Sequence, residues 1–212
     1  MKILILVLSY EDNGIYSEFL KSQKSTWDSF NVDGIETFYY FGNSDKCYIK
    51  GNHIYTDVKE SLMNCTKKTI KCFESIKDFE FDYIFRTNSS SYVDKNLLKN
   101  FILDKPKTKF YSGIIGDFLN QKFCSGSGYF LSKDLVLFLI ENQNKLNNNL
   151  IDDVSISKVL EMLNVELVNS ERFDVHDSNN INPNYFHYRL KTQNRVYDIN
   201  NMKKIMELKC NL

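Results

Sequence analysis

Residues 81–94 read Phe-Asp-Tyr-Ile-Phe-Arg-Thr-Asn-Ser-Ser-Ser-Tyr-Val-Asp, an apolar segment followed by a polar one. Its first part, Phe81–Arg86, is typical of a buried strand, and the sequence from Lys95 onward is typical of a helix. A strand that opens into a loop before a helix is where α/β folds place their chemistry. This loop offers an amide and three hydroxyls, and no carboxylate comes before Asp94. Because hard divalent cations prefer carboxylate ligands, the loop bears directly on whether a metal is held.

The same alternation of strand and helix continues on both sides of this stretch. Strand patterns lie at 3–9, 36–41, 47–55 (a short pair), 110–113, 128–131 and 165–168. Helical spacing marks 15–30, 62–76, 97–103, 134–141 and 151–163. Such alternation predicts one α/β domain over residues 1–212, with a central mixed, mostly parallel sheet. The tail from Asn179 is predicted to be polar and irregular, apart from a last helix at 202–208.

Composition narrows the class of protein. Lys plus Arg and Asp plus Glu number 27 each, so bulk charge gives no argument for nucleic acid or a membrane surface. The five cysteines are odd in number and show no paired spacing, which favours a reduced, intracellular protein. No Cys-x-x-Cys motif occurs and the three histidines are scattered, so zinc is not predicted. The apolar start, Met1–Leu8, is too short for a membrane span and lacks a cleavage site.

Two further motifs indicate ligand contacts, and each has a plainer alternative. In Glu60–Thr69, Asn64 and Lys68 share one face of the predicted helix, where the lysine could reach a phosphate or a base. The alternative is a capped amphipathic helix with solvated lysines. Gly126 and Gly128 precede an apolar strand and permit a ligand to approach the backbone closely. A glycine turn that enters a strand is the alternative there.

Two charged groups indicate proton transfer and anion binding. Asp152 and Asp153 precede a helix, where one carboxylate could take a proton from a hydroxyl. Acidic residues at a helix start are also ordinary stabilisers. Near the end of the chain, alternation in an extended segment would align several cationic side chains that suit a diphosphate, with a solvated tail as the alternative. These residues are His187, Arg189, Lys191 and, further on, Arg195.

Taken in order, these motifs resemble those of the family 31 glycosyltransferases, which include β-1,3-galactosyl- and N-acetylglucosaminyltransferases and the fringe proteins. That family carries Arg-x-Thr-Trp, Asp-Ser-Tyr-x-Asn-Leu-Thr-x-Lys-Thr, Asp-Asp-Asp, Cys-Ser-Gly-x-Gly-Tyr and Glu-Asp-Val motifs. This chain carries Lys-Ser-Thr-Trp at 24–27, Glu-Ser-Leu-Met-Asn-Cys-Thr-Lys-Lys-Thr at 60–69, Asn-Ser-Ser at 88–90, Cys-Ser-Gly-Ser-Gly-Tyr at 124–129 and Asp-Asp-Val at 152–154. The resemblance covers roughly residues 1–170.

The resemblance implies a single-domain glycosyltransferase A fold, with a nucleotide-binding half at about 1–94 and an acceptor half at about 95–212. It implies inverting transfer of a hexose-type sugar from a UDP-sugar to a hydroxyl of a glycan, glycolipid or protein-linked sugar. Asp153 matches the family's general base, and Asp152 takes the neighbouring Glu position. The expected donor contacts are Ser9, Tyr10, Asn64, Lys68, Arg86, Asn88, Ser89 and Ser90; the expected acceptor contacts are Gly126, Ser127 and Gly128.

Two departures from the family change these expectations. Asn88, Ser89 and Ser90 stand where the family's aspartates bind manganese, and amides and hydroxyls are poor substitutes around a hard cation. Transfer without a required metal or other cofactor, or with a greatly weakened manganese site, is therefore predicted, with the diphosphate neutralised by positioned cations. The cations available are Arg86, His187, Arg189, Lys191 and Arg195. The family's usual amino-terminal membrane span is also missing from this sequence, which predicts a cytoplasmic enzyme from a bacterium or a virus, or an excised domain.

Two other functions remain compatible with the sequence. A degenerate protein of the same fold could bind a nucleotide-sugar or a glycan without catalysis, although the presence of Asp153 favours activity. A nucleotidyl-sugar pyrophosphorylase is a further alternative. Such enzymes generally carry a basic, glycine-rich loop after the first strand, and Ser9–Gly14 does not resemble one.

Overall fold

The amino-terminal apolar run forms strand β1 (Ile3–Leu8) at the centre of the fold. The computed structural model describes residues 1–12 and 14–210. Odd-numbered side chains of β1 pack into one hydrophobic cluster, and Leu4 and Leu6 pack into another on the opposite face. A strand buried on both faces reads as a continuous apolar run, which is why the start of the chain lacks polar alternation.

The main sheet contains eight strands. Besides β1 these are β2 (Ile35–Phe41), β3 (Tyr48–Lys50), β4 (His53–Tyr55), β5 (Tyr83–Asn88), β7 (Tyr111–Phe118), β8 (Gln121–Ser132) and β9 (Leu167–Asn169). Their order is β3-β4-β2-β1-β5-β8-β7-β9. β1 pairs in parallel with β2 and β5, as β2 does with β4 and β7 with β9. The β3–β4, β5–β8 and β7–β8 pairs are antiparallel, so the sheet is mixed as predicted.

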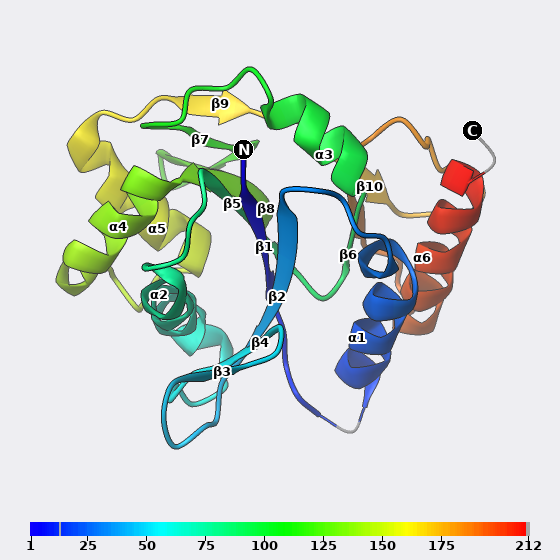
Figure 1. Ribbon diagram of the computed structural model, residues 1–212, viewed down its shortest axis with the longest axis horizontal. Coiled ribbons are helices and arrows are strands. Elements are labelled where there is room, and N and C mark those ends of the chain that lie inside the picture. Colours follow the sequence, from blue (N-terminus) through cyan, green and yellow to red (C-terminus); the bar gives the residue numbers. More distant parts are fainter. Residues whose placement is uncertain (13, 211–212) are drawn as a thin grey trace.

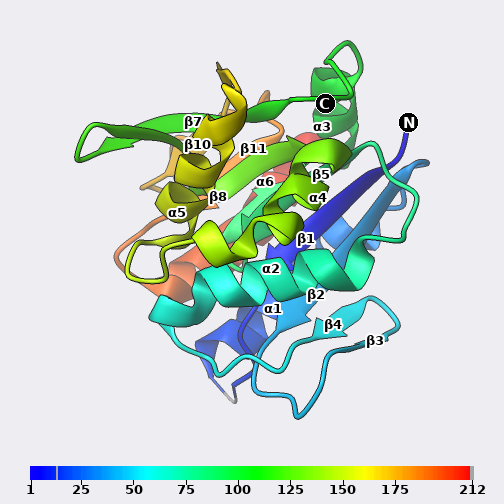
Figure 2. The same cartoon turned by 90° about the vertical axis from the view of Figure 1, so that its left-hand side faces the viewer.

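Helices cover both faces of this sheet (Figures 1 and 2). One layer consists of α2 (Cys65–Ile76), α4 (Lys133–Glu141) and α5 (Asp152–Leu160), whose apolar residues share a cluster with Leu4 and Leu6. The other layer contains α1 (Ile15–Ser25), α3 (Lys95–Ile102) and α6 (Arg195–Cys210). Short 3-10 turns are η1 (Trp27–Ser29), η2 (Leu62–Asn64), η3 (Gln143–Lys145) and η4 (Glu161–Leu163).

A second sheet corrects the expectation of an irregular tail. It has the order β10 (Phe173–Val175), β11 (His187–Leu190), β6 (Ser91–Val93). α6 also begins at Arg195, well before the predicted start of the last helix. The prediction of an irregular tail was wrong because these strands span only three or four residues, and because β11 pairs with β6, which lies far away in the sequence. Local periodicity carries little information about such pairings.

The β7–β8 hairpin is longer than the two short strands predicted for it. It projects from the body of the fold in Figure 2. Its turn is formed by Leu119 and Asn120, which both have positive φ (52° and 65°), as the tightest hairpin turns require. Further along, β8 passes beside the start of α5, so the hairpin connects the outer edge of the sheet to the candidate site.

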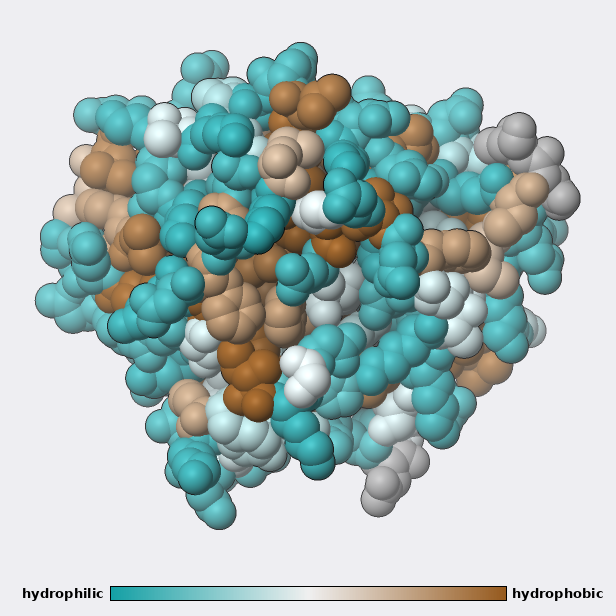
Figure 3. All heavy atoms as spheres, in the orientation of Figure 1, coloured by the Kyte–Doolittle hydropathy of each residue, from teal (hydrophilic) through white to brown (hydrophobic). Residues whose placement is uncertain are grey.

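The surface seen in Figure 3 is mainly hydrophilic at its periphery, with apolar side chains gathered toward its middle. Within residues 1–12 and 14–210, every helix is too short or too polar to cross a bilayer. The proposed division into a nucleotide-binding half and an acceptor half stays a prediction.

Candidate functional site

A cavity of about 520 Å³ opens where β1 and β5 end and where α2 begins, and we call it the strand-end cavity. Its size falls within the range of small-molecule sites. Parallel neighbours β1 and β5 finish at the same edge of the sheet, which is where ligands bind in open α/β folds. The residues that line it are Leu8, Ser9, Tyr10, Tyr16, Glu60, Ser61, Leu62, Cys65, Lys68, Asn88, Ser89, Ser90 and Arg195.

The turn between β5 and β6 forms one wall of this cavity and is fixed from within. The side-chain oxygen of Asn88 accepts hydrogen bonds from the Ser90 amide (3.1 Å), the Ser90 hydroxyl (3.1 Å) and the Ser91 hydroxyl (3.2 Å). From α1, the buried amide of Gln23 donates to the backbone oxygens of Asn88 (3.2 Å) and Ser91 (3.0 Å). The turn is therefore rigid and neutral.

These residues do not fit a hard divalent cation. The Asn88 side-chain oxygen, the strongest neutral ligand in the turn, already accepts from three donors. The Ser89 hydroxyl donates to the backbone oxygen of Leu8 (3.2 Å), and no carboxylate is present among Asn88, Ser89 and Ser90. Within residues 1–12 and 14–210, no group of three or more His, Cys, Asp or Glu side chains is arranged to hold a metal ion.

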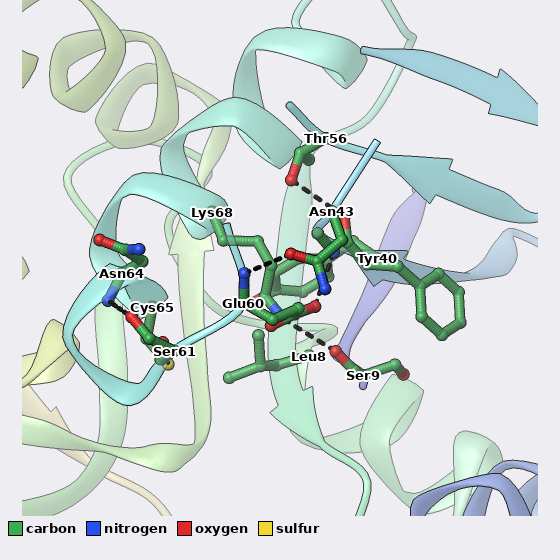
Figure 4. A network of polar contacts seen from close by, with 12 residues as sticks. Leu8, Ser9, Tyr40, Asn43, Thr56, Glu60, Ser61, Asn64, Cys65 and Lys68 are labelled. Carbon is green, nitrogen blue, oxygen red and sulfur yellow. Dashed lines mark hydrogen bonds and ion pairs between the residues drawn. The ribbon is translucent and has the colours of Figure 1, made fainter. Parts of the chain in front are cut away.

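A buried ion pair forms the opposite wall (Figure 4). Lys68 Nζ lies 2.8 and 2.7 Å from the two carboxylate oxygens of Glu60, and it also donates to the backbone oxygen of Ser9 (2.8 Å). Glu60 accepts in turn from the Gly42 amide at the end of β2 (2.6 Å). Burial lowers the pKa of Lys68, while Glu60 opposes that shift. The pair thus ties the ends of β1 and β2 together, and it faces the cavity with its charge already balanced.

Arg195 supplies a second cation, at the start of α6. Its side chain remains 44% exposed, and its guanidinium carbon lies 5.5 Å from the centre of the Phe19 ring. Nη1 donates to the fully buried carboxylate of Asp198 (2.8 Å), which also accepts from the amide and hydroxyl of Thr192. The guanidinium is therefore positioned at the cavity wall, and its exposure leaves it accessible to an anionic ligand.

Arg86 is buried and is not among the residues that line the strand-end cavity. Its Nε donates to the Tyr40 hydroxyl (3.1 Å), Nη1 to the backbone oxygen of Gly126, and Nη2 to Asp152. Burial opposes the charge of Arg86, but Asp152 and the two tyrosines nearby, Tyr40 and Tyr129, hold its pKa above the ordinary value. The side chain is 2% exposed, so Arg86 acts from beneath the site.

Asp153, the second residue of α5, lies beside this pair and is 8% exposed. One carboxylate oxygen accepts from the Gly126 amide (2.6 Å) and the other from the Val154 amide (3.0 Å). Burial raises the pKa of Asp153, and the neighbouring charge of Asp152 raises it further. A carboxylate with a raised pKa is the better proton acceptor, as general-base catalysis requires.

The two glycines of β8 make room for protein side chains. A Cβ added at Gly128 would lie 2.2 Å from the ring of His187, and one at Gly126 would lie 3.1 Å from both Arg86 and Asp153. His187 is itself buried, with its ring 3.3 Å from the Ser91 hydroxyl. Burial, aided by two nearby arginines, lowers its pKa to about 3, so His187 is neutral at pH 7.

Sequence reasoning missed Arg172, which lies next to β10. Its guanidinium forms a bidentate pair with Asp174 (2.5 and 3.1 Å) and donates to the hydroxyls of Ser125 (3.2 Å) and Ser127 (2.5 Å). The charged alternation Arg-Phe-Asp-Val at 172–175 is the signal that would have indicated a strand with this side chain on the site face.

The structure thus divides the predicted site residues. Those that line the strand-end cavity are Ser9, Tyr10, Lys68, Asn88, Ser89, Ser90 and Arg195. Those beside it, around the start of α5, are Arg86, Gly126, Ser127, Gly128, Asp152, Asp153 and His187. The remaining three predicted residues belong to neither group. Asn64 lines a separate cavity of about 590 Å³, Arg189 is half-buried on β11, and Lys191 is exposed.

Comparison with known proteins agrees with the motif order. No known family profile matches the chain. The chain is 26% identical over 179 residues to mouse β-1,3-galactosyltransferase 5, covering 67% of this chain and 58% of that protein. It is 22% identical over 205 residues to human UDP-GalNAc:β-1,3-N-acetylgalactosaminyltransferase 1, covering 78% of this chain and 61% of that protein. The chain therefore spans 58–61% of the length of these curated relatives, and the resemblance to family 31 is confirmed.

Solved structures agree on the fold. The chain is similar to a glycosyltransferase involved in the glycosylation of the major capsid of PBCV-1, with a TM-score of 0.62, 13% identity, and coverage of 96% of this chain and 100% of that one. It is also similar to the apo-form glycosyltransferase GlyE of Streptococcus pneumoniae TIGR4, with a TM-score of 0.56, 10% identity, and coverage of 100% and 64%. These likenesses confirm the predicted glycosyltransferase A fold.

Proposed function

We propose that this chain is an inverting glycosyltransferase that moves a hexose-type sugar from a UDP-sugar to a glycan or glycolipid hydroxyl without a required metal. The observation that carries the proposal is the pairing of two features at one edge of the sheet. The strand-end cavity offers hydroxyl, amide and cationic groups, and Asp153 lies beside it with a raised pKa. The similarity to β-1,3-galactosyl- and N-acetylgalactosaminyltransferases supports the sugar class.

In this proposal the donor lies along the ends of β1 and β5. Its nucleoside contacts Ser9 and Tyr10, and its diphosphate lies against the neutral turn at Asn88–Ser90 and the guanidinium of Arg195. Positioned hydrogen-bond donors and one cation stabilise the negative charge that builds up on the leaving diphosphate. The turn is rigid before the ligand arrives, so little reorganisation is needed as that charge develops.

The proposed chemical step is a single displacement at the anomeric carbon. The acceptor hydroxyl attacks the anomeric carbon from the face opposite the diphosphate, a new carbon–oxygen bond forms, and the bond to the diphosphate oxygen breaks. Asp153 takes the proton from the attacking hydroxyl, and the nucleoside diphosphate leaves with the electron pair. Hydrogen bonds from the amides of Gly126 and Val154 hold the carboxylate in place during this transfer.

A protein that binds nucleotide or glycan without catalysis is the second candidate. Lys68 and Arg86 favour it, because each already pairs with a carboxylate, Glu60 and Asp152 respectively. With both partners retained, these two cations add little net positive charge for a diphosphate.

A thermal-shift screen of nucleoside diphosphates and nucleotide-sugars, with and without manganese, tests both candidates. Selective binding raises the melting temperature by mass action. The proposal predicts a shift with uridine nucleotides that does not depend on manganese, followed by transfer or donor hydrolysis in the presence of a chelator. Binding without turnover would favour the second candidate. A many-fold rise in turnover with manganese would contradict the metal-free mechanism.

A further inference from the structure

We propose that Arg86 is a positioning residue: acting through the backbone of Gly126, it holds the carboxylate of Asp153 in place for proton transfer. The inference rests on the proposed function only in naming Asp153 as the base. The sequence had placed Arg86 among the donor contacts. In this inference Arg86 does not contact the donor and instead positions Asp153, the proton acceptor.

The contacts form a continuous chain across three elements. Arg86 on β5 donates to the backbone oxygen of Gly126 on β8. The amide of the same glycine donates to Asp153 at the start of α5 (2.6 Å). Arg86 also pairs with Asp152, the residue before the base. One guanidinium thus fixes the strand that presents a hydrogen bond to Asp153 and the helix turn that carries it.

Close packing shows that this arrangement is tightly constrained. A Cβ at position 126 would lie 3.1 Å from Arg86 Nη1 and 3.1 Å from an oxygen of Asp153, a separation that leaves little room for any residue except glycine. The glycine is therefore explained by the close approach of two side chains, one from β5 and one from α5. In this inference Gly126 makes room for Arg86 and Asp153, rather than contacting an acceptor sugar as the sequence had predicted.

Arg86 is poorly suited to contact a donor. Each of its three nitrogens already donates to a protein acceptor, and the side chain is 2% exposed. Its guanidinium carbon lies 5.7 Å from the centre of the Tyr129 ring, which lies in the core. Binding a diphosphate would require these contacts to break, whereas Arg195 is exposed at the cavity wall.

The charged groups around Asp153 make the influence of Arg86 on the pKa of Asp153 measurable. Tyr129 and Cys124 from β8 and Tyr111 from β7 lie nearby, and burial raises the pKa of each, so they stay neutral near pH 7. The charged neighbours are Asp152, which raises the pKa of Asp153, and Arg86, which lowers it. Removing Arg86 alone should therefore raise the pKa of Asp153, and removing both charges together should largely restore it.

The test compares Arg86→Met, Arg86→Met/Asp152→Asn and Arg86→Lys with Arg195→Met as the matched cation control. Three quantities are measured for each: the Kd for UDP by calorimetry, the titration of the Asp153 carboxyl by carbon-13 NMR, and the pH profile of kcat. Circular dichroism checks that each variant is folded. The double variant keeps the test decisive if Arg86→Met does not fold, because it removes both charges of the buried Arg86–Asp152 pair together.

We expect Arg86→Met to leave the Kd for UDP within about twofold, to move the Asp153 titration to higher pH, and to lower kcat by about 100-fold, the effect of a misplaced reacting group. The double variant should return the titration toward the wild-type value yet keep the lower kcat. Arg86→Lys should recover part of kcat. Arg195→Met should show the converse, with weaker UDP binding and an unchanged titration.

Two results would overturn the inference. One is a loss of UDP affinity in Arg86→Met as large as that in Arg195→Met, and the other is an Asp153 titration that Arg86→Met leaves unchanged. Failure of the proposed function has a different signature: the wild type would bind no nucleotide and transfer no sugar. In that case the NMR titration still decides whether Arg86 positions Asp153, because it needs no substrate.

Discussion

The turn after β5 and the start of α5 lie at the same edge of the sheet but have opposite chemistry. In the turn, the side-chain oxygen of Asn88 accepts from Ser90 and Ser91, the Gln23 amide donates to the backbone, and no carboxylate is present. At the start of α5 two carboxylates stand side by side, and only Asp152 has a cationic partner among the described residues. In the proposed reaction the two tasks are therefore separate: the turn provides shape, and α5 provides the reactive charge.

The two aspartates of α5 extend the comparison to adjacent residues. Asp152 forms an ion pair with Arg86 and is held as a structural partner. Among residues 1–12 and 14–210, Asp153 accepts hydrogen bonds from backbone amides alone, and its buried position raises its pKa. A titratable pair whose members experience different surroundings is a common way to assign different roles to like residues.

The largest expected effect comes from removing the reactive charge. Asp153→Asn should lower kcat by about 10²–10⁴, the usual contribution of a general base, while the Kd for UDP stays close to the wild-type value. Steady-state kinetics and calorimetry measure the two quantities. Asp45→Asn, at an exposed position, is the matched control. Turnover near the wild-type rate would show that Asp153 is not the base.

Glu60 tests whether the cavity wall across from the turn is structural. Glu60→Gln would leave the cation of Lys68 buried without its partner, and breaking such a pair costs about 3–5 kcal/mol of stability. Urea denaturation would measure the loss in the free energy of unfolding. The double variant Glu60→Gln/Lys68→Met should recover most of it, since neither charge remains. A single variant as stable as the wild type would mean that the ion pair does not hold the ends of β1 and β2.

Adding carboxylates to the turn would remove the chemical difference between it and the start of α5. Asn88→Asp/Ser90→Asp would place two carboxylates beside the cavity, where a hard cation could bridge them to a diphosphate. We expect manganese to tighten UDP binding to this variant about tenfold, or about 1.4 kcal/mol, and to leave wild-type binding unchanged. Calorimetry with and without manganese measures both. An equal response of the two proteins would remove the turn from the site.

Much of this arrangement could be predicted from the sequence. The apolar run of β1, the strand before Asn88 and the helix after Asp152 placed the polar segments at strand and helix ends. The motif order then indicated which segments meet. Because parallel strands end at one edge, Ser9 and Asn88 were expected to lie together, and both line the cavity.

The sequence could not indicate how the charges are paired. Lys68 was expected to reach a phosphate or a base, and Arg86 to neutralise a diphosphate. In the structure Lys68 pairs with Glu60, eight residues earlier, and Arg86 pairs with Asp152 on a distant segment. Such pairs depend on burial and on distances between segments, which spacing along the chain does not encode. Arg172 was missed for a related reason, since β10 is only three residues long and is stabilised by its neighbour β11.

The smallest expected effect concerns stability, and its sign follows from the raised pKa of Asp153. The ordinary value is 3.8, and burial together with Asp152 raises the folded-state pKa above it. The protonated carboxyl is therefore favoured in the folded state, so its stabilising contribution is full below pH 3.8 and is lost as the pH rises through the folded-state pKa. At neutral pH the wild type bears the cost of a buried carboxylate, which Asp153→Asn removes.

Asp153→Asn should therefore melt at a higher temperature than the wild type at pH 7, and the difference should shrink as the pH falls toward 3.8. Calorimetric melting curves across this range measure the trend, and Asp45→Asn should melt with the wild type throughout. A lower melting temperature for Asp153→Asn at pH 7 would mean that the amide hydrogen bonds from Gly126 and Val154 outweigh burial. Asp153 would then be a structural partner like Asp152, and the contrast between the two carboxylates would not hold.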